Sequence, residues 1–229
     1  MIERMAASKD QDPLAEARRQ MLERDLKGRG ITDPCVLGAM AEIRREQFLS
    51  DAYKPQAYAD CPLPIGFGQT ISQPYIVALM TQELCVDSNC AVLEVGTGSG
   101  YQSAVLSRLA RRVHTIERLS ELSESARAIL RRLGVSNVEF CVGEGSCGWP
   151  QDQLPPGGYF DRIIVTAAVP KIPEPLAKQL AEGGLIVMPV GSGGLQELVV
   201  GRKQQGKIAE KTICSCRFVR LVGKYAFEE

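Results

Sequence analysis

The chain has 229 residues, of which 45% are hydrophobic and 24% charged, and its 27 basic side chains balance its 27 acidic ones. This is the composition of a folded globular protein and excludes fibrous and disordered classes. A net charge of zero gives no general attraction to nucleic acid or to anionic membranes. We therefore expect neither as a partner, and we expect a monomer.

No segment of the sequence predicts export or membrane insertion. The longest apolar runs, such as 75–80 and 185–190, are far shorter than the ~20 residues that span a bilayer, and residues 1–13 lack the apolar centre of a secretory signal. The eight cysteines form no Cys-x-x-Cys pair, which favours buried free thiols over a metal site. We expect a cytoplasmic protein without a metal, and leave the reactivity of Cys61 open.

The first third of the chain predicts helices around an ordered loop. Asp12 and Pro13 are typical of a helix start, and Gly28 and Gly30 of its end, which predicts a helix over 13–27. A second helix is expected over 34–44 and a third from Ser72 to about residue 84. Residues 53–68 are rich in Pro, Gly and aromatic side chains and are expected to form an ordered loop.

Short β-branched runs then alternate with helical stretches. Strands are expected at 91–95, 112–117, 138–142, 160–165 and 185–190, with helices at 101–110, 120–133 and 173–181. This alternation predicts a doubly wound α/β fold with a mostly parallel sheet. Strands at 195–202 and 208–219 follow each other across a short polar turn, which predicts an antiparallel hairpin at the edge of that sheet.

A buried strand runs into the glycine turn Gly96-Thr97-Gly98-Ser99-Gly100. Its G-x-G-x-G spacing differs from the G-x-G-x-x-G of dinucleotide-binding sites, because Tyr101 stands at the last position. Glu94, just before the turn, would repel a phosphate and attract an ammonium group. A cofactor with an amino-acid tail therefore fits better than a dinucleotide.

Two further acids follow the next strands of the predicted sheet. Glu117 ends the second strand, where a carboxylate can accept hydrogen bonds from both hydroxyls of a ribose. Glu144, between Gly143 and Gly145, could accept a hydrogen bond from an adenine amino group. Ribose, adenine and an amino-acid tail together describe S-adenosylmethionine. The alternative is a plain strand-to-helix turn with solvated glutamates.

The sequence resembles the protein-L-isoaspartate O-methyltransferase family over about 30–225. The segments that carry the resemblance are 57–60, Pro62-Leu63-Pro64-Ile65-Gly66, Gly68-Gln69-Thr70-Ile71-Ser72-Gln73-Pro74-Tyr75, the glycine turn, 161–168, 188–191 and 217–219. The resemblance implies a single methyltransferase domain over 1–229, of the class I S-adenosylmethionine-dependent, Rossmann-like type. Within it, N-terminal helices and a substrate loop would occupy 13–84, and the cofactor-binding α/β core with its hairpin 85–229.

The same resemblance implies the reaction and the residues that serve it. The reaction is protein repair: methyl transfer from S-adenosyl-L-methionine to the free α-carboxylate of isoaspartyl residues in damaged proteins and peptides. Ser72 matches the family's catalytic residue. The cofactor-binding residues would be Ser72, Gln73, Glu94, Gly96, Thr97, Gly98, Ser99, Gly100, Glu117, Gly143, Glu144, Gly145 and Thr166. The substrate-binding residues would be Thr70, Ile71, Ser72, Ala167, Ala168, Val219, Arg220 and Leu221.

This chemistry needs little from the protein. An α-carboxyl group has a pKa of roughly 3.3–3.7, so it is already an anion at neutral pH and needs no general base. A neutral donor such as the Ser72 hydroxyl, at the start of a helix, would orient this carboxylate without the tight ion pair that would make it a weaker nucleophile. The alternative for Ser72 is a plain helix cap. Two residues depart from the family pattern: Arg220 stands where Pro is usual, and Glu144 where Asp is usual.

Three other functions stay open on sequence grounds. The same scaffold could methylate a small-molecule carboxylate or hydroxyl. A nicotinamide-dependent oxidoreductase is less compatible with the glycine spacing. A cofactor-binding regulatory domain without turnover is left open by Arg220. Flanking-residue preference and the cellular substrates cannot be derived from the sequence.

Overall fold

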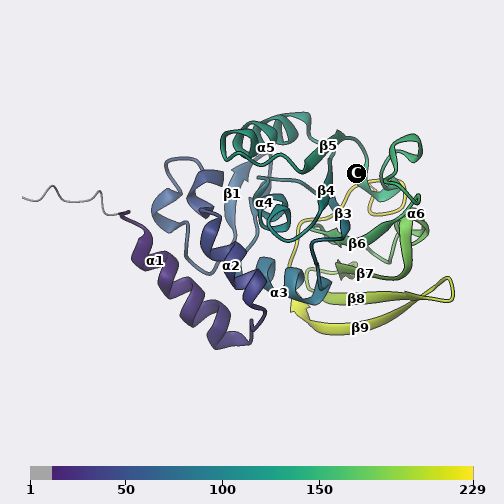
Figure 1. Ribbon diagram of the computed structural model, residues 1–229, viewed down its shortest axis with the longest axis horizontal. Coiled ribbons are helices and arrows are strands. Elements are labelled where there is room, and N and C mark those ends of the chain that lie inside the picture. Colours follow the sequence, from purple (N-terminus) through teal and green to yellow (C-terminus); the bar gives the residue numbers. More distant parts are fainter. Residues whose placement is uncertain (1–11, 229) are drawn as a thin grey trace, which may run out of the picture.

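A twisted seven-stranded sheet forms the centre of the protein. The computed structural model describes residues 12–228 (Figure 1). The strands are β3 (Ala91–Val95), β4 (Arg112–Glu117), β5 (Val138–Val142), β6 (Phe160–Val165), β7 (Leu180–Val190), β8 (Gln196–Gln204) and β9 (Lys207–Cys216). Their spatial order is β5-β4-β3-β6-β7-β8-β9, parallel from β5 to β7 and antiparallel in β7-β8-β9. The predicted doubly wound fold with an antiparallel edge hairpin is confirmed.

The strand order reverses beside β3. The chain runs outward from β3 to β4 and β5, and then returns to place β6 on the other side of β3. Loops leaving the carboxyl ends of β3 and β6 therefore diverge, and a crevice for ligands forms at such a point.

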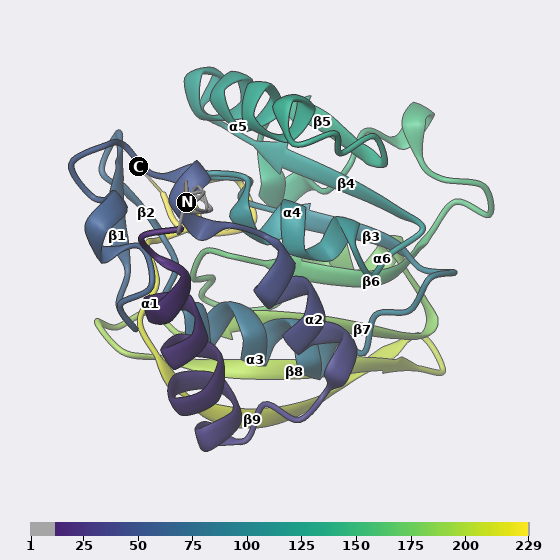
Figure 2. The ribbon, with the colours of Figure 1, turned by 60° about the vertical axis from the view of Figure 1, so that its left-hand side comes forward.

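Helices cover both faces of the sheet. α3 (Pro74–Leu84), α4 (Tyr101–Ser107) and α5 (Ser120–Arg132) pack on one face, and α6 (Glu174–Gln179) packs on the other. α2 (Pro34–Glu42) lies outside α3 and α4, and the N-terminal helix lies beside it (Figure 2). Within residues 12–228, none of the helices is both long and apolar enough to cross a bilayer.

The N-terminal helix lies two residues later in the chain than expected and is less regular. It begins as α1 (Ala15–Gln20), continues as a π-helix (Met21–Leu26) and ends in a 3₁₀ turn (Lys27–Arg29) before Gly30 at φ +93°. Asp12 accepts a hydrogen bond of 3.0 Å from the Leu14 N–H. The expected start and glycine exit are therefore confirmed to within two or three residues. Most of the polar segment that argued against a secretory signal lies outside the described residues.

Two boundaries differ from the sequence expectation for physical reasons. Residues 53–68 are not wholly loop, because β1 (Leu63–Gly66) pairs with β2 (Gln69–Ile71) in a small hairpin. The last strand ends at Cys216 rather than at 219, because residues 217–228 leave the sheet and turn back across the carboxyl ends of the central strands. Both differences bring new segments to the crevice beside β3.

Candidate active site

The glycine turn after β3 has three glycines with positive φ, and each of them has different neighbours. Gly96 (φ +98°) lies against Thr166, whose hydroxyl donates to the Gly96 carbonyl at 2.6 Å; a Cβ on Gly96 would stand 2.4 Å from that hydroxyl. Gly98 (φ +51°) faces Ile65 of the β1–β2 hairpin. Both positions keep the backbone open to a ligand.

Gly100 packs closely against α5 and does not line the cavity. Its φ is +85°, and an added Cβ would stand 2.9 Å from both Ala126 and Leu130 of α5. This close helix contact is the role that the last glycine has in the dinucleotide pattern, taken here one position earlier. Gly100 is not among the residues that line the cavity, and its expected part in cofactor binding stays a prediction.

A cavity lies over this turn, between the β1–β2 hairpin and the C-terminal segment. Fourteen of the residues expected at the site line it: Thr70, Ile71, Ser72, Gly96, Thr97, Gly98, Ser99, Glu117, Gly145, Thr166, Ala167, Val219, Arg220 and Leu221. Residues from six separate parts of the chain thus meet in one place. The sequence reasoning missed several lining residues, among them Gln69, Gln102, Arg118, Leu119 and Val222.

Glu117 is the acid that the structure brings into the cavity. It ends β4 and is 8% exposed. One carboxylate oxygen accepts from the Gly98 N–H at 3.0 Å, and the other from the Leu119 N–H at 3.1 Å. The carboxylate is therefore held against the glycine turn with acceptor capacity left for hydroxyl groups of a ligand.

Glu94, whose carboxylate is expected to attract a cofactor ammonium, does not line the cavity. Its side chain is fully buried beneath the turn and accepts hydrogen bonds from Ser103 and from Thr115, the latter at 2.7 Å. Burial raises the pKa of Glu94 to about 8, against the opposing effect of these two hydroxyls. Thr115 in turn shares a 2.7 Å hydrogen bond with Thr97, so Glu94 supports the turn from behind.

Glu144, expected to bind an adenine amino group, also lies outside the cavity lining. It accepts hydrogen bonds from Ser146 and from the Cys147 thiol, the latter at 3.2 Å, and Gly223 lies so close that a Cβ there would overlap its carboxylate. Burial opposes the charged form, but the hydrogen bonds outweigh it and hold the pKa of Glu144 below its ordinary value. Glu144 thus fastens the C-terminal segment, whose Tyr225 N–H also donates to Ser146 at 3.0 Å.

Three other expected residues lie outside the cavity lining. Gly143 lies behind the cavity and donates its N–H to the Glu117 carbonyl at 2.9 Å. Ala168 is fully buried and pairs through its backbone with the C-terminal segment. Gln73 donates to Asp60 at 2.7 Å and is directed away to the loop before β1. The walls of the cavity thus include Ser72 with β2, the glycine turn and the C-terminal segment.

Ser72 lies one residue before the cap of α3. The cap position is Gln73, whose side chain makes no capping bond. Ser72 lines the cavity and is half-buried. Its hydroxyl is therefore not used as the helix cap, which was the alternative to a functional role.

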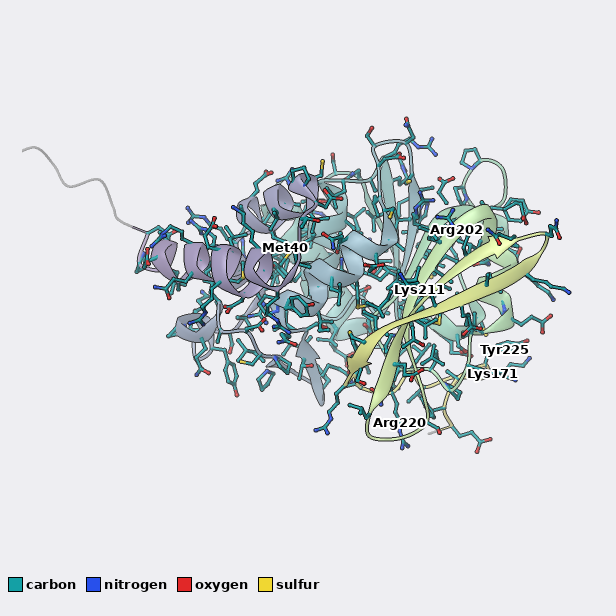
Figure 3. The ribbon with its side chains drawn as sticks, turned by 90° about the horizontal axis from the view of Figure 1, so that it is seen from below. Met40, Lys171, Arg202, Lys211, Arg220 and Tyr225 are labelled. Atoms are coloured by element: carbon teal, nitrogen blue, oxygen red, sulfur yellow. The ribbon has the colours of Figure 1, made fainter. Side chains whose placement is uncertain are left out.

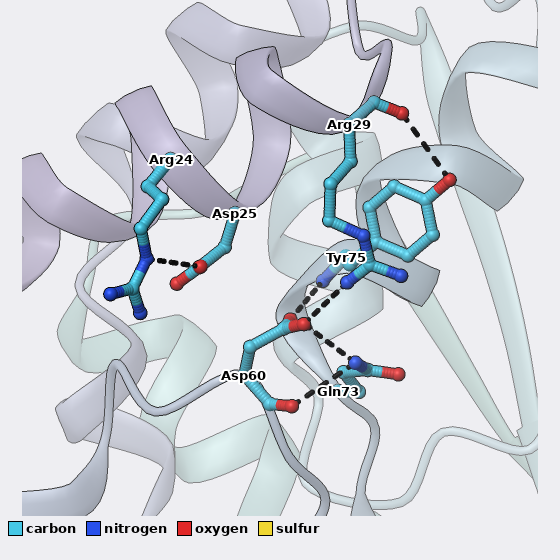
Figure 4. A network of polar contacts seen from close by, with 6 residues as sticks. All are labelled: Arg24, Asp25, Arg29, Asp60, Gln73 and Tyr75. Atoms are coloured by element: carbon cyan, nitrogen blue, oxygen red, sulfur yellow. Dashed lines mark hydrogen bonds and ion pairs between the residues drawn. The ribbon is translucent and has the colours of Figure 1, made fainter.

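Asp60 holds the segment that follows Ser72 (Figure 4). Its carboxylate accepts from Arg29 at 2.6 Å, from Gln73 at 2.7 Å and from the Tyr75 N–H at 3.2 Å. The Arg29 guanidinium also lies 3.5 Å from the centre of the Tyr75 ring. One carboxylate therefore ties the start of α3 to the end of the N-terminal helix.

Arg45 holds the same segment from inside the protein. It is fully buried and donates to the carbonyl oxygens of Ala57, of Cys61 at 3.2 Å and of Ser72 at 3.0 Å. Burial lowers the pKa of its guanidinium below the ordinary value. No sequence pattern predicts this role, because an Arg in a charged run is usually solvated. No group of three or more His, Cys, Asp or Glu side chains in residues 12–228 is placed to hold a metal ion.

Comparisons with known proteins agree with this geometry. The family profile "Protein-L-isoaspartate(D-aspartate) O-methyltransferase (PCMT)" matches residues 16–226. The protein-L-isoaspartate O-methyltransferases of Koribacter versatilis and Methanoregula boonei are 51% and 49% identical to the chain, over 97% and 94% of its length and 98% and 97% of theirs.

Two solved structures share the fold. A protein-L-isoaspartate O-methyltransferase superposes with a TM-score of 0.79 at 30% identity, over 91% of this chain and 67% of that one. A Plasmodium falciparum candidate member, solved in complex with S-adenosyl-L-homocysteine, superposes with a TM-score of 0.75 at 26% identity, over 90% of this chain and 98% of that one.

Proposed function

The chain belongs to the protein-L-isoaspartate O-methyltransferase family, and we propose that its cavity over the glycine turn is where this enzyme performs the family's reaction. The protein is an S-adenosylmethionine-dependent enzyme that methylates isoaspartyl residues. One observation supports this location of the active site. Ser72 and the turn Gly96–Ser99 belong to different segments of the chain, and both line the same cavity. A methyl donor on the turn and an acceptor beside Ser72 would then share one space.

The residues present fit S-adenosylmethionine. The turn offers backbone without side chains at Gly96 and Gly98, and Glu117 places a carboxylate for ribose hydroxyls beside it. Gly145 and Thr166 complete the wall. When bound, this cofactor supplies a methyl group on positively charged sulfur. The protein's own contribution is to hold that group by the turn and to exclude water from it.

Ser72 would orient the acceptor. The α-carboxylate of an isoaspartyl residue is already ionised at neutral pH, so no side chain has to remove a proton. A neutral hydroxyl can donate to one carboxylate oxygen while the other remains free to react. Thr70, Ile71 and Ala167 line the space around Ser72 and would contact the peptide backbone.

The oligomeric state, cellular location and partners of the protein are proposed from its composition. We infer a monomer in the cytoplasm that binds neither nucleic acid nor membrane, since basic and acidic residues are equal in number and all eight cysteines are free thiols. The two structural parts, 13–84 and 85–229, would act as one domain, because β2 from the first and the glycine turn from the second line one cavity.

Product chemistry tests the proposed site. Purified protein is incubated with radiolabelled S-adenosylmethionine and a matched pair of peptides that differ only in isoaspartyl or aspartyl linkage. We expect a base-labile methyl ester on the isoaspartyl peptide alone, and loss of most labelling in Ser72→Ala. Equal labelling of both peptides, or full activity in Ser72→Ala, would contradict the proposal.

A further inference from the structure

Arg220 lines the cavity at its rim and is exposed. We propose that its guanidinium binds an acidic side chain that flanks the isoaspartyl residue, so that this enzyme prefers peptides with a nearby Glu or Asp. The inference deepens the proposed function and rests on it. It assigns to one residue of this chain a preference that the reaction itself does not require.

The backbone around Arg220 is fixed against the sheet. The Ala168 N–H donates to the Val219 carbonyl at 2.7 Å, and the Leu221 N–H donates to the Ala168 carbonyl at 2.8 Å. Arg220 therefore sits between two hydrogen bonds to the loop that follows β6. Its position relative to the cavity is set by the core and not by a mobile tail.

The side chain itself is exposed and is braced on one aromatic ring. The Arg220 guanidinium carbon lies 5.1 Å from the centre of the Phe227 ring. Phe227 is held by its own N–H, which donates to the Leu221 carbonyl at 3.0 Å. Figure 3 shows Arg220 at the lower edge of the molecule, away from Arg202 and Lys211 on the β8–β9 hairpin.

The charge of Arg220 is available to a ligand. Within residues 12–228, none of the carboxylates forms an ion pair with it. Glu117 is the acidic residue in the cavity lining, and both of its oxygens are engaged by backbone N–H groups of the glycine turn and of Leu119. A planar guanidinium with free donors is suited to a carboxylate, which it can bind through two parallel hydrogen bonds.

The reacting α-carboxylate is a poor partner for this guanidinium. Its negative charge is lost as the methyl ester forms, so a tight ion pair would stabilise the starting state more than the transition state. A carboxylate on a neighbouring residue keeps its charge throughout the reaction. Binding it at the rim helps substrate and transition state equally, and raises kcat/KM without slowing the methyl transfer.

The expected effect is modest, because the pair would form in contact with water. Exposed ion pairs contribute about 0.2–1 kcal/mol, which corresponds to a preference of about 1.4–5-fold. Such a pair is also screened by salt, with a Debye length that falls from about 10 Å at 0.1 M to about 3 Å at 1 M. A preference due to Arg220 should therefore fade as salt is added.

Competition between two peptides in one tube measures the ratio of their kcat/KM values directly. One isoaspartyl peptide carries Glu beside the isoaspartyl residue and the other carries Gln there, and the pair is made for the preceding and for the following position. We expect the wild-type enzyme to prefer Glu by about 2–5-fold in at least one pair at low salt. Arg220→Gln should bring that ratio to about one, and Arg220→Lys should retain part of it.

Arg217→Gln is the matched control. Arg217 is exposed, lies three residues earlier, is outside the cavity lining and donates to the Gly194 carbonyl at 3.1 Å. It should keep the wild-type ratio. A wild-type ratio of one in both pairs, an unchanged ratio in Arg220→Gln, or an equal loss in Arg217→Gln would overturn the inference while leaving the proposed function intact. Methylation of neither isoaspartyl peptide would instead refute the proposed function, and this inference with it.

Discussion

The Arg45 guanidinium donates a 3.0 Å hydrogen bond to the backbone carbonyl of Ser72. The same buried group also binds the carbonyls of Ala57 and Cys61, so one side chain joins the two ends of the β1–β2 hairpin. Its partners are neutral carbonyls, which satisfy the two terminal nitrogens of the buried guanidinium, whereas Nε has no hydrogen-bond partner among the described residues. The cavity wall that contains Ser72 is therefore set by a residue 27 positions earlier.

Arg45→Lys tests this relationship. An ammonium group cannot reach three carbonyls in different directions, so we expect the free energy of unfolding to fall by about 2–4 kcal/mol. We also expect kcat to fall in protein that is still folded, because Ser72 is no longer fixed. Urea unfolding and peptide methylation measure the two effects. The control is Arg44→Lys, an exposed neighbour paired with Asp12, which should change neither; equal effects in both variants would contradict the role given to Arg45.

Ser72→Ala should separate catalysis from cofactor binding. Removing the hydroxyl takes away a donor to the acceptor carboxylate but leaves the glycine turn intact, so we expect kcat to fall at least about tenfold. The affinity for S-adenosylhomocysteine, measured by calorimetry, should stay within a few-fold. Ser215→Ala, on the exposed side of β9, is the control and should behave as wild type. A loss of cofactor affinity as large as the loss of turnover would place Ser72 in the cofactor site instead.

The carboxylate of Glu117 should carry much of the cofactor affinity. Glu117→Gln keeps the size of the side chain but presents an N–H₂ group to one of the two backbone donors, Gly98 and Leu119. Hydrogen bonds to a charged group contribute about 1.5–3 kcal/mol, so we expect the Kd for S-adenosylhomocysteine to rise roughly tenfold or more. Glu121→Gln, exposed at the start of α5, is the control. An unchanged Kd would show that Glu117 only shapes the turn.

The positions of Glu94, Glu117 and Glu144 show which parts of the site can be predicted from the sequence. Glu94 and Glu117 both seemed to stand at strand ends, but Glu94 is followed by Val95 within β3, and a central parallel strand is covered on both faces. Its side chain is therefore buried in the helix layer. Glu117 is the last residue of its strand and so reaches the cavity. The position of Glu144 depends on the C-terminal segment, whose path no local pattern predicts.

The fold could be predicted from the sequence because the patterns that indicate it are local. Alternating strands and helices, the glycine turn and the polar turn of the last hairpin each depend on neighbouring residues. The β1–β2 hairpin was missed because its strands are short and β1 contains Pro and Gly, which are unfavourable in strands. Arg45 and Asp60 were missed as organising residues because their partners lie 12–31 positions away.

Gly96→Ala should harm the enzyme more than its backbone strain alone can explain. A Cβ would meet the Thr166 hydroxyl at 2.4 Å, in a residue with φ +98°. Gly30→Ala supplies a matched control, since Gly30 has φ +93° with nothing within 4 Å. Strain alone costs roughly 1–2 kcal/mol. We expect Gly30→Ala to lose about that much stability and keep activity, while Gly96→Ala loses more and binds S-adenosylhomocysteine at least about tenfold more weakly.

Urea unfolding measures the stability of the two glycine variants, and calorimetric titration measures their affinity for S-adenosylhomocysteine. Equal losses of stability with cofactor affinity retained would show that Thr166 moves aside freely. In that case the contact between Gly96 and Thr166 would not shape the cofactor site.

Glu94 should make the protein less stable as the pH rises. Its pKa is raised by burial to about 8 in the folded protein, against an ordinary 4.5 when unfolded. Between these values the folded state holds a proton that the unfolded state has released, so rising pH favours unfolding, by up to about 1.4 kcal/mol per pH unit. The stabilisation is complete below pH 4.5 and is lost as the pH passes 8.

Glu94→Gln should remove this dependence. Its carbonyl oxygen can still accept from Ser103 and Thr115, and its amide has no charge to bury. Urea unfolding between pH 7 and 8 avoids the titration of His114, whose pKa burial lowers from 6.5. We expect the wild-type slope in this range to be absent in Glu94→Gln and retained in Glu210→Gln, an exposed control on β9. Parallel slopes in all three proteins would mean that Glu94 is ionised in the folded state, and that the buried network beneath the glycine turn carries a charge.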